Sequence, residues 1–222
     1  MEIRRTANAG VLLKLENATI LLDGVCREVF PYLCTPSSLQ EELLLAKPDV
    51  VAFTHHHKDH FDSDFSQKFS EKYGRKVIGT EQMAQLYPDT VSFSQCIVGE
   101  NWKLSAFQTR HIGKAGLTTD HLSYIVEADR CVWFMGDASP VQMKLLCACP
   151  RPDVLIVPYA YLISPPAIQA VENLQPGQIV LVHMPLKEQD PDGLWQMIAP
   201  ARERLADRLI IPELGQTITY LC

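Results

Sequence analysis

The sequence predicts a layered α/β fold in which helices cover the strands. Four apolar runs of strand length carry this prediction. None of them alternates with polar residues, so each strand must be buried on both faces. The segments between the runs contain helix-start signals, and the length of 222 residues fits one domain over residues 1–222. The four runs are Val50–Phe53, Val132–Met135, Val154–Val157 and Ile179–Val182.

Two short β-type runs open the chain. Gly10–Glu16 and Ala18–Leu22 flank Asn17, and Asp23-Gly24 closes the second run. Apolar runs separated by turn-forming residues predict a β-hairpin meander near the N-terminus.

Helix starts follow from capping signals. Ser38 and Glu41 have the spacing of a capping box, and the helix they open is expected to end before Pro48. An oxygen-bearing side chain before a proline is typical of a helix N-terminus, because proline fits the first helical position. This pair occurs at Ser139-Pro140, Ser164-Pro165 and Asp190-Pro191.

The composition disfavours several classes of protein. The formal net charge is −6 and no stretch gathers Lys and Arg, which argues against a nucleic-acid partner. No apolar stretch approaches the ~20 residues of a membrane span, so we expect no membrane association. The seven cysteines are odd in number and include no CxxC pair, which predicts a cytoplasmic protein without a disulfide framework. Homo-oligomerisation is left open.

Each of the four buried runs ends in a chemically distinctive side chain. These are His55, Asp137, Tyr159 and His183. In layered α/β folds, ligands bind beyond the carboxyl ends of the strands. We therefore expect these side chains to build one site.

The segment Thr54–His60 holds four of the seven histidines and an aspartate. In an extended strand exit, His55 and His57 point to the same side and can hold one ion. Asp59 and His60 follow where Asp62-Ser63 can begin a helix, so the chain turns and these two side chains can hold a second ion. Imidazole and carboxylate ligands suit Zn²⁺, Fe or Mn²⁺.

The block Thr54-His55-x-His57-x-Asp59-His60 resembles the HxHxDH signature of the metallo-β-lactamase superfamily. Phe107–His111, Gly136-Asp137 and Leu181–His183 are similar to the segments that carry the later ligands, in the expected order. By this resemblance the first metal takes His55, His57 and His111, the second takes Asp59, His60 and His183, and Asp137 bridges both.

The resemblance implies an αββα four-layer sandwich of two mixed β-sheets flanked by helices, with the metals at one edge. It covers almost the whole chain, and a closer likeness is to small single-domain hydrolases such as the ascorbate-6-phosphate lactonase-like group. True metallo-β-lactamases usually have a cysteine or another ligand where this chain has Asp137, and they lack a complete second site of one Asp and two His, which argues against antibiotic hydrolysis. Ala138 replaces a hydroxyl residue that many members carry there.

The implied activity is a dinuclear metallohydrolase. Two divalent ions, Zn first and Mn or Fe as alternatives, would share a bridging hydroxide, because two metals ~3.5–4 Å apart lower the pKa of water toward about 7. The hydroxide would attack an ester, lactone or phosphodiester bond of a small molecule, and an anionic substrate is left open. Asp59 would also orient the hydroxide, as family members are thought to do.

Three alternatives stay open. The first is an iron-dependent redox enzyme of the same superfamily, similar to a sulfur dioxygenase and expected to need one metal. The second is a nuclease acting on RNA or DNA, and the third is a metal-bound scaffold without turnover. The number of ions per chain is the first observation expected to distinguish the redox enzyme from the hydrolase.

Several further residues are candidates for contact with the substrate. His121 is the best non-ligand candidate for proton delivery, and we expect it to be catalytic together with Asp59. Lys187 lies four residues after His183 and is a candidate for binding an anionic group. The glycine-bearing segment Gly113–Thr119 is a candidate loop over the site, and Tyr159 is expected at the mouth of the pocket.

Overall fold

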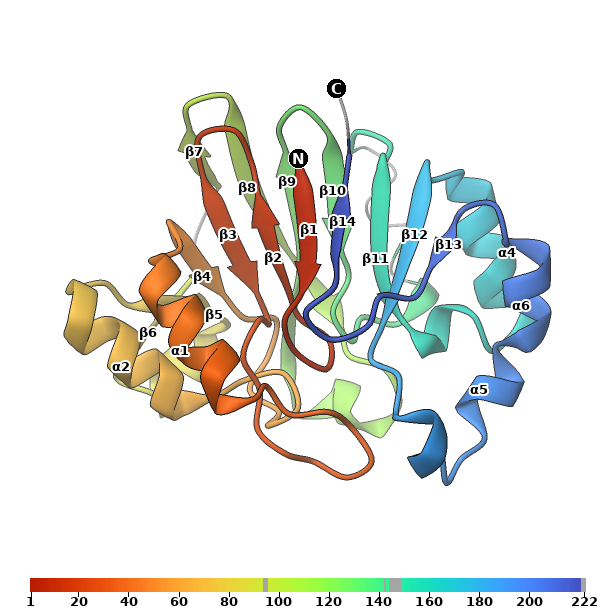
Figure 1. The fold of residues 1–222 in the computed structure, drawn as a ribbon, viewed down its shortest axis with the longest axis horizontal. Coiled ribbons are helices and arrows are strands. Elements are labelled where there is room, and N and C mark those ends of the chain that lie inside the picture. The colour runs from red at the N-terminus through yellow and green to blue at the C-terminus, as the bar shows by residue number, and fades with distance from the viewer. Residues whose placement is uncertain (94–95, 142, 144–148, 221–222) are drawn as a thin grey trace.

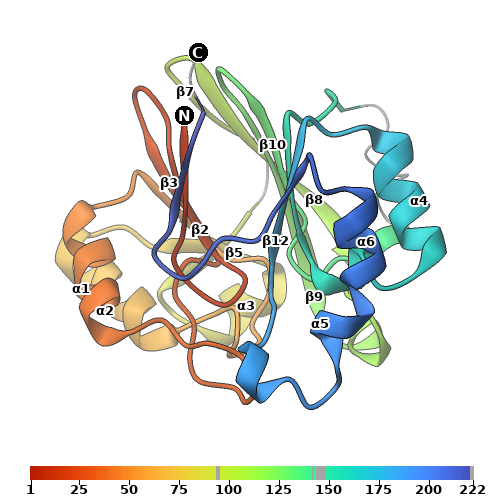
Figure 2. The same ribbon diagram turned by 45° about the vertical axis from the view of Figure 1, so that its right-hand side comes forward.

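The structure is a computed structural model that describes residues 1–93, 96–141, 143 and 149–220. Within these residues the strands form two mixed seven-stranded sheets that lie face to face. Helices cover the two outer sides, as Figure 1 shows, and Figure 2 shows the same layers after a turn of 45°. The expected αββα sandwich is confirmed.

Each sheet has an antiparallel half and a parallel half. The order of the first sheet is β14 (Thr217–Thr219), β1 (Glu2–Arg5), β2 (Val11–Lys14), β3 (Thr19–Leu22), β4 (Val50–Ala52), β5 (Val77–Gly79) and β6 (Thr90–Ser92). The order of the second sheet is β13 (Leu209–Ile210), β12 (Gln178–Val182), β11 (Val154–Pro158), β10 (Cys131–Phe134), β9 (Asp120–Glu127), β8 (Trp102–Arg110) and β7 (Ile97–Gly99). The predicted hairpin is β2 and β3, and the four apolar runs are β4, β10, β11 and β12.

The helices divide between the two outer faces. The first sheet is covered by α1 (Ser37–Ala46), α2 (Ser63–Tyr73) and α3 (Glu81–Leu86). The second sheet is covered by α4 (Pro165–Leu174), α5 (Leu194–Met197) and α6 (Ala199–Arg204). Short 3₁₀ helices lie at η1 (Lys114–Leu117), η3 (Tyr159–Tyr161) and η4 (Lys187–Gln189). None of these helices combines the length and the apolar character that a bilayer crossing requires.

Three apolar layers explain why the strand sequences do not alternate. Along β11, Val154 and Ile156 pack between the sheets, whereas Leu155 and Val157 pack in the cluster formed with α4, α5 and α6. All four side chains are fully buried. A strand between two apolar layers needs apolar residues on both faces.

The helix starts agree with the sequence only in part. α4 begins at Pro165 after Ser164, as predicted, but α1 begins at Ser37, and no side chain caps it. α5 begins at Leu194 rather than Pro191, because the Asp190 carboxylate accepts hydrogen bonds from the backbone N–H groups of Leu194 and Trp195. The helix predicted after Ser139-Pro140 extends over residues 142 and 144–148, which lie outside the described residues.

Candidate metal centre

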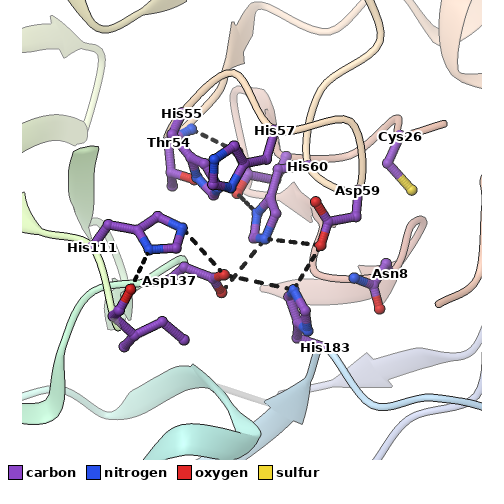
Figure 3. Close-up of polar contacts among 12 residues, drawn as sticks. Asn8, Cys26, Thr54, His55, His57, Asp59, His60, His111, Asp137 and His183 are labelled. Carbon is purple, nitrogen blue, oxygen red and sulfur yellow. Dashed lines mark hydrogen bonds and ion pairs between the residues drawn. The ribbon is translucent and has the colours of Figure 1, made fainter. Parts of the chain in front are cut away.

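The seven predicted ligands converge at one edge of the sandwich (Figure 3). They come from both sheets: the segment 55–60 follows β4, and the other three ligands follow β8, β10 and β12. Within each of three overlapping groups, the ligand atoms lie within 4.8 Å of one another. The groups are His55, His57 and His111; His55, His60 and Asp137; and Asp59, His60 and His183.

The chain turns within the segment that follows β4. The His57 carbonyl accepts hydrogen bonds from the N–H groups of His60 and Phe61, at 3.0 and 2.9 Å. Asp62 then caps α2 by accepting from the backbone N–H groups of Asp64 and Phe65. The turn brings Asp59 and His60 into one ligand group with His183, whereas His55 and His57 share a group with His111.

Two histidines of this cluster have Nδ1 occupied and Nε2 free. Nδ1 of His60 lies 2.8 Å from Asp23 Oδ2, and Nδ1 of His111 lies 2.8 Å from the Ile112 carbonyl. Because these oxygens only accept, Nδ1 carries the proton in both rings. Each Nε2 is buried without a hydrogen-bond partner in the described residues. A buried nitrogen lone pair without a partner is the donor that a metal ion needs.

His55 is oriented in the same way through Thr54. The Thr54 hydroxyl donates to Asp23 Oδ2 at 2.7 Å, so its oxygen accepts from Nδ1–H of His55 at 2.9 Å. Nε2 of His55 is again buried and unpartnered among the described residues. Asp23 Oδ1 also accepts from the Thr54 N–H at 2.7 Å. One carboxylate therefore orients His60 directly and His55 through the threonine.

Sequence reasoning missed Asp23. The Asp23-Gly24 pair has the composition of a turn, and the sequence alone predicts only that. The overlooked signal was its place at the end of a strand, because Asp23 follows β3 as the other site residues follow theirs.

The two carboxylates Asp59 and Asp137 lie among the histidines. Asp59 Oδ2 lies 3.0 Å from His183 Nε2. Asp137 Oδ1 lies 3.4 Å from His60 Nε2, and its Oδ2 lies 3.6 Å from His111 Nε2 and 3.7 Å from His183 Nε2. Asp137 thus faces ligands of both predicted ions, which is the position required of a bridging carboxylate.

The electrostatics of the cluster suit a cation. Burial raises the pKa of Asp59, but the hydrogen bond from His183 and the charge of His60 outweigh it and lower the pKa to about 2. Burial lowers the pKa of His60, but Asp137 and Asp23 outweigh that effect and hold it well above 6.5, so without a cation Nε2 of His60 takes up a proton where it would otherwise bind a metal. Burial and the neighbouring His111 lower the pKa of His57 to about 4. The ionised carboxylates thus lie beside imidazoles whose charged form is disfavoured at His55 and His57, and carboxylate and imidazole donors together fit divalent ions.

The surroundings of His121 suit a positioning role, and its expected catalytic role stays a prediction. This buried residue of β9 accepts a hydrogen bond at Nε2 from the Asp137 N–H, at 3.0 Å. Its Nδ1–H consequently donates to Thr109 Oγ1 at 2.8 Å, Thr109 donates to Ser123 Oγ at 3.0 Å, and Ser123 donates to the Met135 carbonyl at 3.0 Å. Both ring nitrogens of His121 are therefore in use as hydrogen-bonding groups.

The other candidates lie at different places around the centre. Thr119, the last residue of the segment Gly113–Thr119, has its hydroxyl 3.4 Å from His57 Nε2. Lys187 stacks on Trp195, with Nζ 5.0 Å from the ring centroid. Lys187 and Trp195 line a cavity of about 1160 Å³ beside α5 and α6, and none of the seven predicted ligands belongs to that lining. Contact of Lys187 with a substrate stays a prediction.

Comparison with known proteins gives one family match. A family model described as the beta-lactamase superfamily domain matches residues 2–183. No curated protein matches the chain.

Solved structures share the fold over nearly the full chain. A possible metal-dependent hydrolase from Veillonella parvula is 18% identical, with a TM-score of 0.76 and 99% of each chain covered. An isothiocyanate hydrolase from Delia radicum gut bacteria is 15% identical, with a TM-score of 0.72 and 99% of each chain covered. CmlA, a diiron beta-hydroxylase from Streptomyces venezuelae, is 16% identical, with a TM-score of 0.70, and the match covers 99% of this chain and 54% of that one.

Proposed function

Because the chain belongs to the beta-lactamase superfamily, whose model matches residues 2–183, we propose that it is a metal-dependent hydrolase with two divalent ions. One observation carries the proposal: three buried histidines have Nδ1 occupied and Nε2 unpartnered among the described residues, around a carboxylate. Leaving such buried polar atoms unpaired is costly, so a ligand is expected there. The histidines are His55, His60 and His111, and the carboxylate is Asp137.

The proposed ligand sets follow the geometry. His55, His57 and His111 would hold the first ion, Asp59, His60 and His183 the second, and Asp137 both. Imidazole and carboxylate donors make Zn²⁺ the first choice and Mn²⁺ or Fe the alternatives. When bound, two divalent ions lower the pKa of water and polarise the oxygen of the scissile group.

The residues of the chain supply position and proton control. Asp59 and Asp137 are ionised and can accept a hydrogen bond from the attacking water, which orients its lone pair toward the substrate. Asp23 and Thr54 hold His60 and His55 in one tautomer. An ester, lactone or phosphodiester of a small molecule would suit such a site, because no serine or cysteine nucleophile is needed. The cysteine pattern continues to favour the cytoplasm.

An oxidative reaction is the second candidate. It is favoured by the shared fold with a diiron hydroxylase, a protein with two irons. The number of ions per chain is therefore not enough to separate hydrolysis from oxidation, contrary to the expectation from the sequence. The identity of the metal and a requirement for oxygen separate them.

Protein prepared without added metal, then loaded with Zn²⁺, Mn²⁺ or Fe²⁺, tests the proposal. We expect about two ions per chain and turnover of an ester, lactone or phosphodiester panel without oxygen. His57→Ala and Asp137→Ala should abolish turnover and lower metal content. His56→Ala is the matched control, because its ring belongs to none of the three ligand groups. Retention of metal and turnover in both ligand variants contradicts the proposal, and turnover that requires iron and oxygen favours oxidation.

A further inference from the structure

Two tyrosines from different layers pack against His183. Tyr32 lies in the loop between β3 and α1, and its ring meets that of His183 edge-on, with centroids 4.4 Å apart. Tyr159 begins η3 directly after β11, with its ring centroid 5.8 Å from that of His183. Both residues are half-buried, and both lie beside the candidate metal centre.

The Tyr32 and Tyr159 hydroxyls are neighbours, and each influences the pKa of the other. Each phenol has one O–H, so a bond between the two hydroxyls would use only one donor. Within the described part of the chain, no hydrogen bond of either hydroxyl to another residue is found, so at least one O–H donor remains. The ring contacts with His183 place both phenols beside the candidate metal centre.

The loop that carries Tyr32 is held in place by its backbone. The Tyr32 N–H donates to the Val29 carbonyl at 2.7 Å. Further along, the Thr35 N–H donates to the Cys26 carbonyl at 3.3 Å, and the Cys26 N–H donates to Thr35 Oγ1 at 3.1 Å. The phenol therefore needs little rearrangement to meet a ligand, which is the condition under which a hydrogen bond contributes most to catalysis.

We propose that the Tyr32–Tyr159 hydroxyl pair donates a hydrogen bond to the substrate oxygen that gains negative charge beside His183. A phenol is protonated at neutral pH, since its ordinary pKa is about 10. It is therefore a donor rather than a base, and it complements a carbonyl or phosphoryl oxygen as that oxygen becomes an oxyanion. The inference rests on the proposed hydrolysis and adds the class of group that the site recognises.

Tyrosine-to-phenylalanine variants of the metal-loaded protein test the pair. Phenylalanine keeps the ring against His183 and removes only the hydroxyl. We expect Tyr159→Phe and Tyr32→Phe each to lower kcat about 10- to 1,000-fold with little change in KM. Their affinity for inorganic phosphate, a tetrahedral oxyanion, should fall about 10-fold, with metal content unchanged. Because the hydroxyls act as a unit, the double variant should resemble the more impaired single variant.

Tyr73→Phe is the matched control, because it removes a hydroxyl that donates to the Leu44 carbonyl away from the centre. It should leave kcat and phosphate affinity unchanged. If the wild type binds metal and turns over, but both variants keep its kcat and phosphate affinity, the role of the tyrosines is overturned and the hydrolase proposal stands. If the wild type takes up no metal, both proposals fail.

Discussion

At the residue scale, the carboxylate of Asp23 acts on ligands of both proposed ions. It accepts hydrogen bonds from His60 Nδ1–H and from both the N–H and the hydroxyl of Thr54. We expect Asp23→Asn to weaken metal binding about 10- to 100-fold, because an amide cannot accept all three bonds. Asparagine tolerates the positive φ of 45° at this position, so the change tests the carboxylate rather than the backbone.

Metal titration of the metal-free protein measures this effect. Asp49→Asn is the control, since Asp49 Oδ2 accepts from the N–H and the hydroxyl of Thr19 at an exposed position away from the centre. Equal metal affinity in Asp23→Asn and Asp49→Asn would show that Asp23 does not orient the ligands.

His121 gives a prediction for the pH dependence of stability. Burial, despite the charge of Asp137, lowers the pKa of His121 to about 3 in the folded protein, against 6.5 in the unfolded chain. Between these values the unfolded state binds the extra proton, so stability falls as pH falls from 6.5 toward 3. We expect His121→Gln to make this slope shallower by up to about 1.4 kcal/mol per pH unit. Urea unfolding with chelator at several pH values from 4.5 to 6.5 measures this slope for both proteins. An unchanged slope in His121→Gln would contradict a lowered pKa of His121 in the folded protein.

A comparison of the proposed ligands with His121 shows what the sequence does and does not reveal about single residues. The seven residues proposed as ligands could be named from the sequence because four lie in the HxHxDH block, two end apolar runs, and the resemblance to the family implies the seventh, His111. The role of His121 was not predictable, because its partners Thr109, Ser123 and the Asp137 amide come from three segments that meet only in the folded sheet. Hydrogen-bond partners of that kind are set by tertiary structure.

At the scale of the element, the turn after β10 places Asp137. Gly136 in this turn has φ +52°, and an added Cβ would lie 2.6 Å from Thr54 Cγ2 and 2.9 Å from His121 Nε2. Gly74, which ends α2, has a similar φ of +63° but no atom within 4 Å of such a Cβ. The two glycines thus share a backbone conformation and differ in their surroundings.

Replacing each glycine with alanine separates the free-energy cost of backbone strain from that of a steric clash. We expect Gly74→Ala to lose about 1–2 kcal/mol, the usual cost of a left-handed conformation. Gly136→Ala should lose a further 1–3 kcal/mol and reduce metal content, because Thr54 and His121 must move. Urea unfolding and metal analysis of both variants test this, and equal losses with full metal content would show that the turn can relax.

The elements themselves were predictable to different degrees. Long buried strands such as β11 and β12 were recognised because two apolar layers demand an unbroken apolar run. The two-residue β13 was not recognised, since so short a run has no period. α5 begins later than the predicted start at Pro191, because the Asp190 carboxylate accepts hydrogen bonds from the backbone N–H groups of Leu194 and Trp195.

At the scale of the whole molecule, the pairing of distant segments was the part that the sequence left undetermined. β14 closes the first sheet against β1, with Glu2 opposite Thr219. Contacts between the ends of a chain depend on the complete fold rather than on local pattern. The same fold brings the proposed ligands together from both sheets. Residues 55–60 follow β4 of the first sheet, and the remaining ligands follow strands of the second sheet.

Metal removal should therefore loosen the sandwich as a whole. An ion that binds only the folded state stabilises it by about 2.7 kcal/mol when its free concentration is 100 times Kd. For a chain of this size, about 2–4 °C per kcal/mol follows, so each such ion should raise Tm by about 5–11 °C. Thermal unfolding with chelator and with saturating Zn²⁺ measures the shift. Leu43→Ala, in the α1 layer away from the centre, should lower both values of Tm and leave their difference unchanged, because distant sites contribute additively. A wild-type Tm that does not respond to metal would mean that the ions, if bound at all, do not hold the two sheets together.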